Sequence, residues 1–234
     1  MIEDFPLVAR KQNETLQEWT YQQLRYAIMV GVFSPGVSVT MRGLAQMLGV
    51  SLMPVREALR RLVAEHALEL LPNRRVSVPT MTAERFEELC ATRINLECLA
   101  AERAILAVSR DDLEFMYLAD AAMDKALKEG DVVESVIQNH HFHTRLYTAA
   151  PSQVLFPLIE NLWLQFGPFM RGVLEQVGED FNNGKYLVDR HQETLRAIER
   201  RDPPALRKAI EADIRDGIGA TGMQGLQAAA KLAL

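Results

Sequence analysis

The sequence lacks any long run of apolar residues, although 48% of its 234 residues are hydrophobic. A helix that crosses a bilayer needs about 20 consecutive apolar residues, and no stretch of this chain approaches that length. The first fourteen residues, MIEDFPLVARKQNE, also lack the apolar core of a secretory signal. Both absences argue against a membrane protein and against export, so we expect a cytoplasmic protein without a membrane partner.

Cysteine is also scarce, with two residues in the chain. Cys90 and Cys98 are eight residues apart on one predicted helix, which separates them by about 12 Å along the helix axis. That distance is too long for a disulfide. We therefore expect both side chains to be buried apolar groups in a reducing compartment.

The chain has no overall excess of positive charge, because its formal net charge is −5. The charge is unevenly spread, however. Residues 1–78 carry nine Lys and Arg against seven Asp and Glu, whereas residues 79–234 carry seventeen against twenty-four. Residues 41–75 alone hold six arginines and three glutamates. A basic segment that suits nucleic acid therefore precedes an acidic module.

Residues 41–62, MRGLAQMLGVSLMPVREALRRL, predict two short helices joined by a tight turn. Leu44 and Leu48 give the first helix an apolar face at helical spacing. Ser51 is a good N-cap for the second helix, and Pro54 falls in its first turn, where a missing N–H costs nothing. Two such helices packed at a steep angle, the second with exposed arginines, fit the DNA major groove.

The residues that follow predict a wing. A strand over residues 67–71, a turn, and a return strand over 75–78 complete a winged helix with arginines near the hairpin tip. An ordinary helix hairpin with solvated arginines is the plainer interpretation, but the strand–turn–strand pattern favours DNA binding. The side chains that we expect to contact DNA are Arg42, Ser51, Leu52, Met53, Arg56, Arg60, Arg74 and Arg75.

Residues 24–62 closely resemble the N-terminal domain of GntR-type bacterial transcription regulators. The motifs are Gly31 followed by Pro35-Gly36, the Leu-Ala…Leu-Gly-Val-Ser run, and Pro-Val-Arg-Glu-Ala-Leu. The remainder resembles the FadR-type (FCD) effector domain. The resemblance implies a mainly α protein, in which a winged helix-turn-helix of three helices and a small β-hairpin precedes an all-α antiparallel bundle.

The second part of the chain independently predicts a helical bundle, since helical spacing dominates after Val78 and no convincing strand appears. Caps and breakers set the expected helices at residues 83–107, 110–128, 132–149, 152–178 with interruptions near Pro157 and Pro168, 183–201, and from Pro204 onward. We expect a DNA-binding domain over residues 1–78 and a linker over 79–82. An effector-binding and dimerisation domain would follow over 83–234, with a partly frayed tail.

Four polar side chains of the predicted bundle stand at spacings that bring them together. Asn139 and His143 are four residues apart and share a helix face. His191 and Asp213 are equidistant from the turn at Asp202, so they would face each other across an antiparallel helix pair. Metal sites in bundles are built in this way, and two histidines with a carboxylate suit Zn²⁺, Ni²⁺, Mn²⁺ or Fe²⁺. The alternative is a set of hydrogen-bonded polar groups that line a cavity.

The resemblance supports the metal site and adds effector contacts. Many FCD domains bind a divalent metal through Asp, His, His and His at these spacings, but this chain has Asn139 for the Asp and Asp213 for the last His. FCD domains also carry Arg-x-x-x-Glu at Arg93, and that arginine often faces the cavity, where it would grip a carboxylate. The plainer interpretation is an ion pair on a solvated face. The effector contacts that the resemblance implies are Arg93, Asn139, His143 and His191.

The predicted recognition helix departs from the family. Leu52 and Met53 replace the usual Arg-Thr, which removes one charged DNA contact, although both are able to contact thymine methyl groups. His66 replaces a usual Gly at the end of this helix, and histidine tolerates a left-handed backbone better than most residues. DNA binding should persist with an unusual operator sequence.

The sequence as a whole predicts a ligand-responsive transcription regulator that is not an enzyme. We expect a homodimer that binds double-stranded operator DNA and a small organic acid, that is, a carboxylate effector. One alternative is a metalloenzyme that uses the bundle's His and Asp residues, but it would also need a general base or nucleophile, and no such motif stands out. The other alternative, a scaffold protein that has lost tight DNA binding, rests on Leu52 and Met53.

Overall fold

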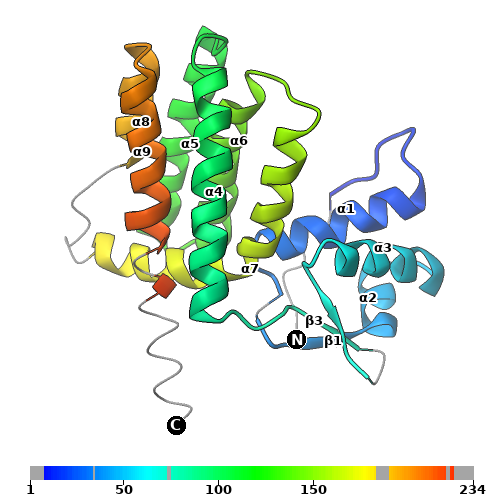
Figure 1. Ribbon diagram of the computed structural model, residues 1–234. Coiled ribbons are helices and arrows are strands. Elements are labelled where there is room, and N and C mark those ends of the chain that lie inside the picture. The colour runs from blue at the N-terminus through cyan, green and yellow to red at the C-terminus, as the bar shows by residue number, and fades with distance from the viewer. Residues whose placement is uncertain (1–7, 34, 73–74, 183–189, 220–221, 224–234) are drawn as a thin grey trace. The chain divides into compact units, whose positions relative to one another are not determined.

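A computed structural model describes residues 8–33, 35–72, 75–182, 190–219 and 222–223. The chain divides into two compact units. The first comprises residues 1–81 together with 163–169, and the second comprises residues 82–162 and 170–234. The described residues are mostly helical, which confirms the predicted mainly α fold (Figure 1). Among them, no helix is both long enough and apolar enough to cross a membrane.

The first unit is a winged helix. Its sheet has the strand order β1-β3-β2 with antiparallel pairs, and Ser77 of β3 lies opposite both Ser38 and Glu69. The predicted hairpin is present with shorter strands, and β1 is a third strand that the sequence analysis did not predict. The elements are α1 (Leu16–Met29), β1 (Ser38–Thr40), α2 (Met41–Leu48), α3 (Leu52–Ala64), β2 (Glu69–Leu70) and β3 (Arg75–Ser77).

Local backbone chemistry sets the angle between α2 and α3. Thr40 caps α2 by accepting a hydrogen bond from the Gly43 N–H, and Gly49 ends it in the left-handed conformation with φ 64°. Ser51 is the extended N-cap residue of α3. His66 follows α3 at φ 59°, which is the left-handed backbone expected where the related domains have glycine.

The core of the first unit is closed by a residue from much later in the chain. Leu24, Val55 and Leu62 are buried together with Leu164, which belongs to α7 (Leu155–Asn182). Beside it, a Cβ on Gly167 would lie 2.4 Å from the Met29 carbonyl oxygen, so only glycine fits this close approach.

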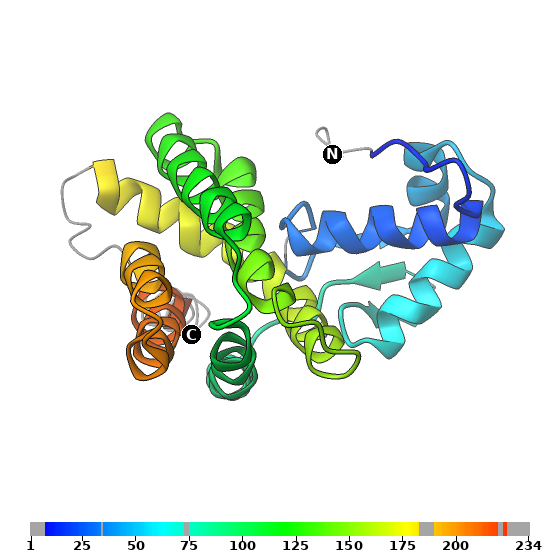
Figure 2. The same ribbon diagram turned by 90° about the horizontal axis from the view of Figure 1, so that it is seen from above.

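The second unit is a helical bundle in which most helices run alongside one another, while the yellow segment of α7 runs across their lower ends in Figure 1 (Figures 1 and 2). Its chain order begins with α4 (Ala83–Ala104), α5 (Arg110–Glu129) and α6 (Val132–Thr148), and after α7 continues with α8 (Arg190–Glu199), α9 (Pro203–Ala212) and a π-helix (Asp213–Gly219). Ser109 and Asp112 form the predicted capping box at the start of α5, and Gly130 ends α5 at φ 73°.

The predicted interruption of α7 is wrong. The helix is continuous from Leu155 to Asn182 with Pro168 inside it, and it does not fade by Gly178. Pro157 is the third residue of the helix, where its missing N–H costs nothing. At Pro168 one backbone hydrogen bond is lost, but buried side chains on both sides, including Leu164 and Met170, hold the helix together. Residues 183–189 and most of the predicted frayed tail lie outside the described residues.

Candidate functional site

The predicted DNA-contacting residues at the start of α3 are at the surface of the first unit. Leu52 and Met53 are 40% and 54% exposed. Arg56 is exposed one turn further along the helix. The remaining exposed members of the predicted set are Arg42, Ser51 and Arg60.

Some arginines of the first unit are engaged within the protein. Arg60 pairs with Glu57 at 3.0 Å in an exposed contact. Arg61 bonds Glu18 at 2.7 Å and lies 3.4 Å from the centre of the Tyr21 ring. It therefore ties α3 to α1.

Arg75 is the first residue of β3 and so lies near the hairpin tip, as predicted, but its side chain is engaged within the protein. Arg75 lies within β3 opposite Thr40, and its Nη2 donates a 2.7 Å hydrogen bond to the Ser38 carbonyl. A β1 strand that the sequence analysis did not predict provides this acceptor. Arg74 lies outside the described residues.

The second unit brings three predicted ligands together in its interior. His143 from α6, His191 from α8 and Asp213 from the start of the π-helix are all buried, and each offers a ligand atom within 4.8 Å of the others. The Nε2 atom of His143 lies 3.2 Å from Oδ2 of Asp213. The His143 and His191 rings are nearly perpendicular, with centroids 5.1 Å apart. The spacing argument from the sequence therefore placed these three residues in one cluster.

The sequence analysis missed two residues that contact the His191 ring, Asp120 and Phe142. Oδ1 of Asp120, on α5, lies 2.9 Å from His191 Nδ1, and Oδ2 of the same carboxylate accepts a 2.7 Å hydrogen bond from Gln192. The Phe142 ring stacks on His191 at 3.9 Å. The available signal was a single aspartate in the apolar stripe of α5, between Met116 and Met123.

A second set of hydrogen bonds orients His143. The Tyr147 hydroxyl donates to Oε2 of Glu97 at 2.8 Å and lies 3.2 Å from His143 Nδ1. Because the hydroxyl has one proton and Glu97 accepts it, His143 Nδ1 carries its own proton and donates it to the tyrosine oxygen. In a neutral ring the Nε2 lone pair then faces the Asp213 carboxylate.

Arg93 and Glu97 form an ion pair that is fully buried. Both side chains are 0% exposed, and Arg93 Nε lies 2.6 Å from Glu97 Oε1 while Nη2 lies 3.4 Å from Oε2. The interpretation of this pair as an ion pair on a solvated face is therefore wrong. A guanidinium in the interior is present, as the FCD resemblance implies, but in this structure it binds the chain's own carboxylate.

Burial and charge act in opposite directions on Asp213. Burial raises the pKa of this carboxyl, but protonated His143, which would donate a hydrogen bond to it, and the positive charge of His143, His191 and Arg93 outweigh burial, so the pKa is below its ordinary value. Burial and the neighbouring Glu97 raise the pKa of Tyr147 well above its ordinary value, so Tyr147 stays a proton donor. The charged groups around Asp213 therefore favour its ionised form.

The side chains present fit a divalent metal ion. Two neutral imidazoles and one carboxylate are a common donor set for borderline divalent cations. Asn139 is 3% exposed and lies one helical turn before His143. Its Nδ2 has no hydrogen-bond partner among the described residues. A buried amide without an acceptor is costly, and turning the amide over would present its oxygen to a cation instead.

Comparison with family models gives two matches. Residues 16–78 match the family described as bacterial regulatory proteins, gntR family, and residues 88–216 match the FCD domain. The first match coincides with the winged helix. The second spans more than half of the chain and contains all the residues of the buried site.

Individual relatives are similar to much of this chain. The HTH-type transcriptional regulator McbR of Escherichia coli (strain K12) is 27% identical over 172 residues, which span 74% of this chain and 78% of the relative. The HTH-type transcriptional regulator YdhC of Bacillus subtilis (strain 168) is 31% identical over 143 residues, 61% of this chain and 64% of the relative.

Solved structures show the same fold. E. coli McbR/YncC superposes with a TM-score of 0.82 at 24% identity, covering 90% of this chain and 99% of that one. A putative transcriptional regulator GntR from Rhodococcus sp. RHA1 superposes with a TM-score of 0.68 at 25% identity, covering 88% of this chain and 96% of that one. The arrangement of a winged helix followed by a helical bundle is therefore shared.

Proposed function

This chain belongs to the GntR family of bacterial regulatory proteins with an FCD domain, and we propose that its buried His143, His191 and Asp213 hold a divalent metal to which a small carboxylate effector binds. The chain is a DNA-binding transcription regulator with a C-terminal effector-binding domain. The proposal concerns the metal, the effector class, the DNA contacts and the homodimer.

The metal proposal rests chiefly on the orientation of the two histidines. Asp120 accepts a hydrogen bond from Nδ1 of His191, and the Tyr147 oxygen accepts one from Nδ1 of His143. Both rings therefore keep Nε2 for a Lewis acid, as metal-binding histidines do when their other nitrogen is hydrogen-bonded. A lone pair on His143 Nε2 that faces an ionised Asp213 at 3.2 Å is unfavourable unless a cation or a proton lies between them.

The effector proposal follows from what three protein ligands leave open. A divalent ion held by two histidines and one carboxylate retains positions for an exogenous ligand, and anionic oxygen is a suitable donor for it. The bound metal would supply the positive charge that attracts the effector's carboxylate. The Arg93 guanidinium is already bound to Glu97. We therefore assign Arg93 a role in positioning Glu97 and Tyr147 behind His143. A direct contact between Arg93 and the effector would require displacement of Glu97.

DNA contact is proposed for the exposed start of α3 and for Arg42 of α2. Arg56 is the arginine of α3 best suited to a base edge or phosphate, because Arg60 pairs with Glu57 and Arg61 pairs with Glu18. Leu52 and Met53 lie beside it and offer apolar contacts to thymine methyl groups. In a homodimer, effector binding would act by changing the spacing of two such surfaces over operator half-sites.

The experiment is a titration of chelator-treated, full-length protein with Zn²⁺, Ni²⁺ and Mn²⁺ by isothermal calorimetry. Saturable binding of one ion per chain that is lost in His143→Ala supports the site. Acetate, succinate and citrate are then titrated into the metal-loaded and metal-free protein, and an operator gel shift on the DNA upstream of its own gene follows each addition. Equal binding of the carboxylates to the metal-loaded and metal-free protein would contradict the proposal. It would indicate a metal-independent pocket in which His143 is protonated and forms a hydrogen bond with Asp213.

A further inference from the structure

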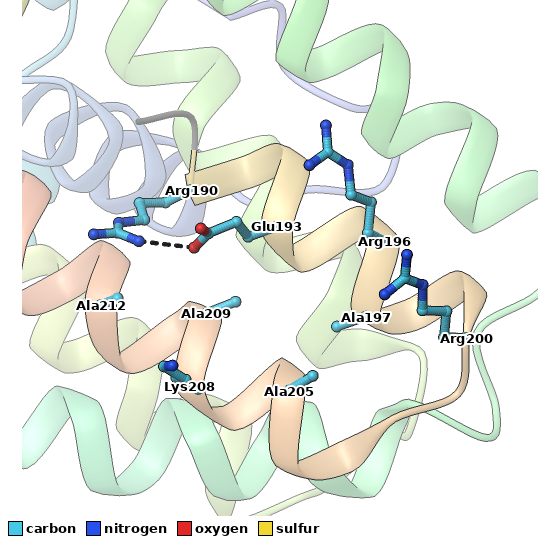
Figure 3. Close-up of a pocket in the computed structure, with 9 residues that line it drawn as sticks. All are labelled: Arg190, Glu193, Arg196, Ala197, Arg200, Ala205, Lys208, Ala209 and Ala212. Carbon is cyan, nitrogen blue, oxygen red and sulfur yellow. Dashed lines mark hydrogen bonds and ion pairs between the residues drawn. The ribbon is translucent and has the colours of Figure 1, made fainter. Parts of the chain in front are cut away.

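A pocket that is separate from the buried His143, His191 and Asp213 site lies along the hairpin formed by α8 and α9. Its volume is about 300 Å³, and Figure 3 shows it as a groove between the two helices. His191, Leu195 and Ile198 of α8 are buried away from it. None of the residues lining the groove belongs to the His143, His191 and Asp213 site. The lining residues are Arg190, Glu193, Arg196, Ala197, Arg200, Ala205, Lys208, Ala209 and Ala212.

The groove is strongly basic within an acidic unit. It is lined by four cationic side chains and one carboxylate, that of Glu193, which Arg190 neutralises at 2.8 Å. Arg190 also pairs with Asp216 at 3.1 Å. In contrast, Arg196, Arg200 and Lys208 make no ion pair with any carboxylate in the described ranges. Three positive charges at the groove are therefore not neutralised by a carboxylate of the described residues.

The spacing of these cations argues against a purely structural origin. Arg196 of α8 and Arg200, the residue just after the end of that helix, are four positions apart, and the Arg200 N–H donates a 3.2 Å hydrogen bond to the Arg196 carbonyl. Like charges at this spacing repel each other. Lys208 lines the facing helix, α9, so all three charges border one groove. Elsewhere on the hairpin the usual compensation is present, since Arg207 pairs with Glu102 at 3.0 Å. A ligand with negative charge would relieve the repulsion that the fold leaves in place.

We propose that this groove binds a small organic phosphate. Its floor is formed by alanines, with Ala197 and Ala209 buried and Ala205 at one end, so a flat apolar group can lie against it. A phosphate dianion above that floor would be held by Arg196, Arg200 and Lys208, because guanidinium groups bind phosphate oxygens in a bidentate manner.

The side chains are able to reach such a ligand. In Figure 3, Arg196 extends from α8 on the side away from α9, and Arg200 lies just after the end of α8; neither has a partner among the residues drawn, and Arg196 reaches the groove by a change of rotamer. Both are exposed, and exposed side chains change rotamer on the picosecond to nanosecond timescale. A monocarboxylate would neutralise one of the three charges, whereas a phosphate monoester neutralises close to two at neutral pH. The groove therefore favours phosphate over the carboxylate class proposed for the buried site.

The test uses full-length protein and phenyl phosphate, which joins a flat ring to a phosphate dianion. Calorimetric titration at near-physiological salt is run in parallel with benzoate and phenol, which carry one charge and none. We expect saturable binding of one phenyl phosphate per chain, weaker binding of benzoate, and no binding of phenol. Absence of saturable phenyl phosphate binding, or equal binding of all three compounds, overturns the proposal.

Matched variants separate the groove from general electrostatics. Arg196→Gln with Arg200→Gln should weaken phenyl phosphate binding by about tenfold or more. Arg103→Gln with Arg110→Gln removes the same charge from exposed positions elsewhere in the unit and should leave it unchanged. Ala205→Leu should block the groove by bulk alone while retaining every cation. An equal loss in the two arginine pairs overturns the assignment to this groove.

Two further readouts exclude other sites. His143→Ala should bind phenyl phosphate as well as the parent protein does, since the ligand does not use the buried cluster; loss of binding in that variant overturns the proposal. A random-sequence DNA duplex is titrated against the Arg196→Gln, Arg200→Gln protein. Weakened duplex binding without any phenyl phosphate binding by the parent protein identifies a DNA-contacting surface instead.

Discussion

Nδ1 of His191 lies 2.9 Å from Oδ1 of Asp120, a residue 71 positions earlier in the chain. A carboxylate accepts hydrogen bonds, so this contact fixes the proton on Nδ1 and leaves Nε2 as the ring nitrogen with a lone pair. Gln192 holds the other oxygen of the same carboxylate at 2.7 Å. Asp120 therefore determines which nitrogen His191 can offer to a metal.

Asp120→Asn should weaken metal binding by about 10–100-fold, the usual effect of removing a hydrogen-bond partner of a metal-binding histidine. The amide is able to donate as well as accept, so the ring is no longer held in one tautomer. The measurement is the dissociation constant for Zn²⁺ by competition with a chelator dye. Asp111→Asn, an exposed change at the start of the same helix, is the control, and an equal effect of both substitutions would rule out the orienting role.

Removal of metal should lower the melting temperature of the second unit. A ligand that binds only the folded state stabilises it by about 2.7 kcal/mol when present at 100 times its dissociation constant. Differential scanning calorimetry with and without chelator measures the change. His143→Ala should melt at the same temperature in both conditions, and a chelator effect that survives this substitution would place the metal elsewhere.

Asn139→Asp should tighten metal binding, because a carboxylate is a better ligand than an amide for a hard or borderline cation. Asn139 is buried next to His143 on the helix, and its Nδ2 lacks a partner among the described residues. Without metal the same variant should be less stable, since it adds a buried negative charge. Asn95→Asp, at an exposed position on α4, should change neither quantity. Weaker metal binding by Asn139→Asp would exclude residue 139 from the ligand set.

Arg93→Ala should destabilise the second unit by about 3–5 kcal/mol, because it leaves Glu97 buried without its counter-charge. The double variant Arg93→Met, Glu97→Met should be markedly more stable than Arg93→Ala, since both charges are then absent from the interior. Urea denaturation of the three proteins gives the comparison. Equal stability of the double and single variants would mean that the buried charge is not the cause.

Arg56→Ala should weaken operator binding by about 1–3 kcal/mol if the guanidinium contacts a base edge. Folding should be unaffected because the side chain is exposed. Fluorescence anisotropy at fixed salt measures the affinity, and Arg103→Ala on the second unit is the control. Unchanged operator affinity would show that α3 does not dock through this face.

Leu52→Arg should strengthen binding to random-sequence DNA and steepen its salt dependence by about one phosphate contact, a slope change of about 0.9 on a logarithmic scale. Leu52 is 40% exposed at the start of α3, so the new side chain has room to reach the backbone of DNA. Leu106→Arg, at a position that is 70% exposed in the second unit, serves as the control. A slope that does not change would mean that Leu52 does not face DNA.

The sequence by itself determined the features that depend on neighbours a few residues away. The turn between α2 and α3 follows from Gly49 and the Ser51 N-cap, and the start of α5 follows from the Ser109 and Asp112 capping box. The left-handed Gly49 ends α2, the extended backbone of Ser51 precedes α3, and the hydrogen bonds of the capping box close within one helical turn, so all of these signals are local. The convergence of His191 and Asp213 was also predictable, because equal distances from one turn fix which residues of an antiparallel helix pair meet.

Only the tertiary structure decided what surrounds those elements. The Asp120 contact to His191, the Glu97 contact to Tyr147 and the place of Leu164 in the core of the first unit all join residues far apart in the chain. Whether Arg93 is solvated or fully buried, and whether α7 continues through Pro168, depends on which side chains pack around them. Packing outweighs local preference at such positions because burial removes a large apolar surface area from water at once. A local signal, in contrast, concerns a single hydrogen bond.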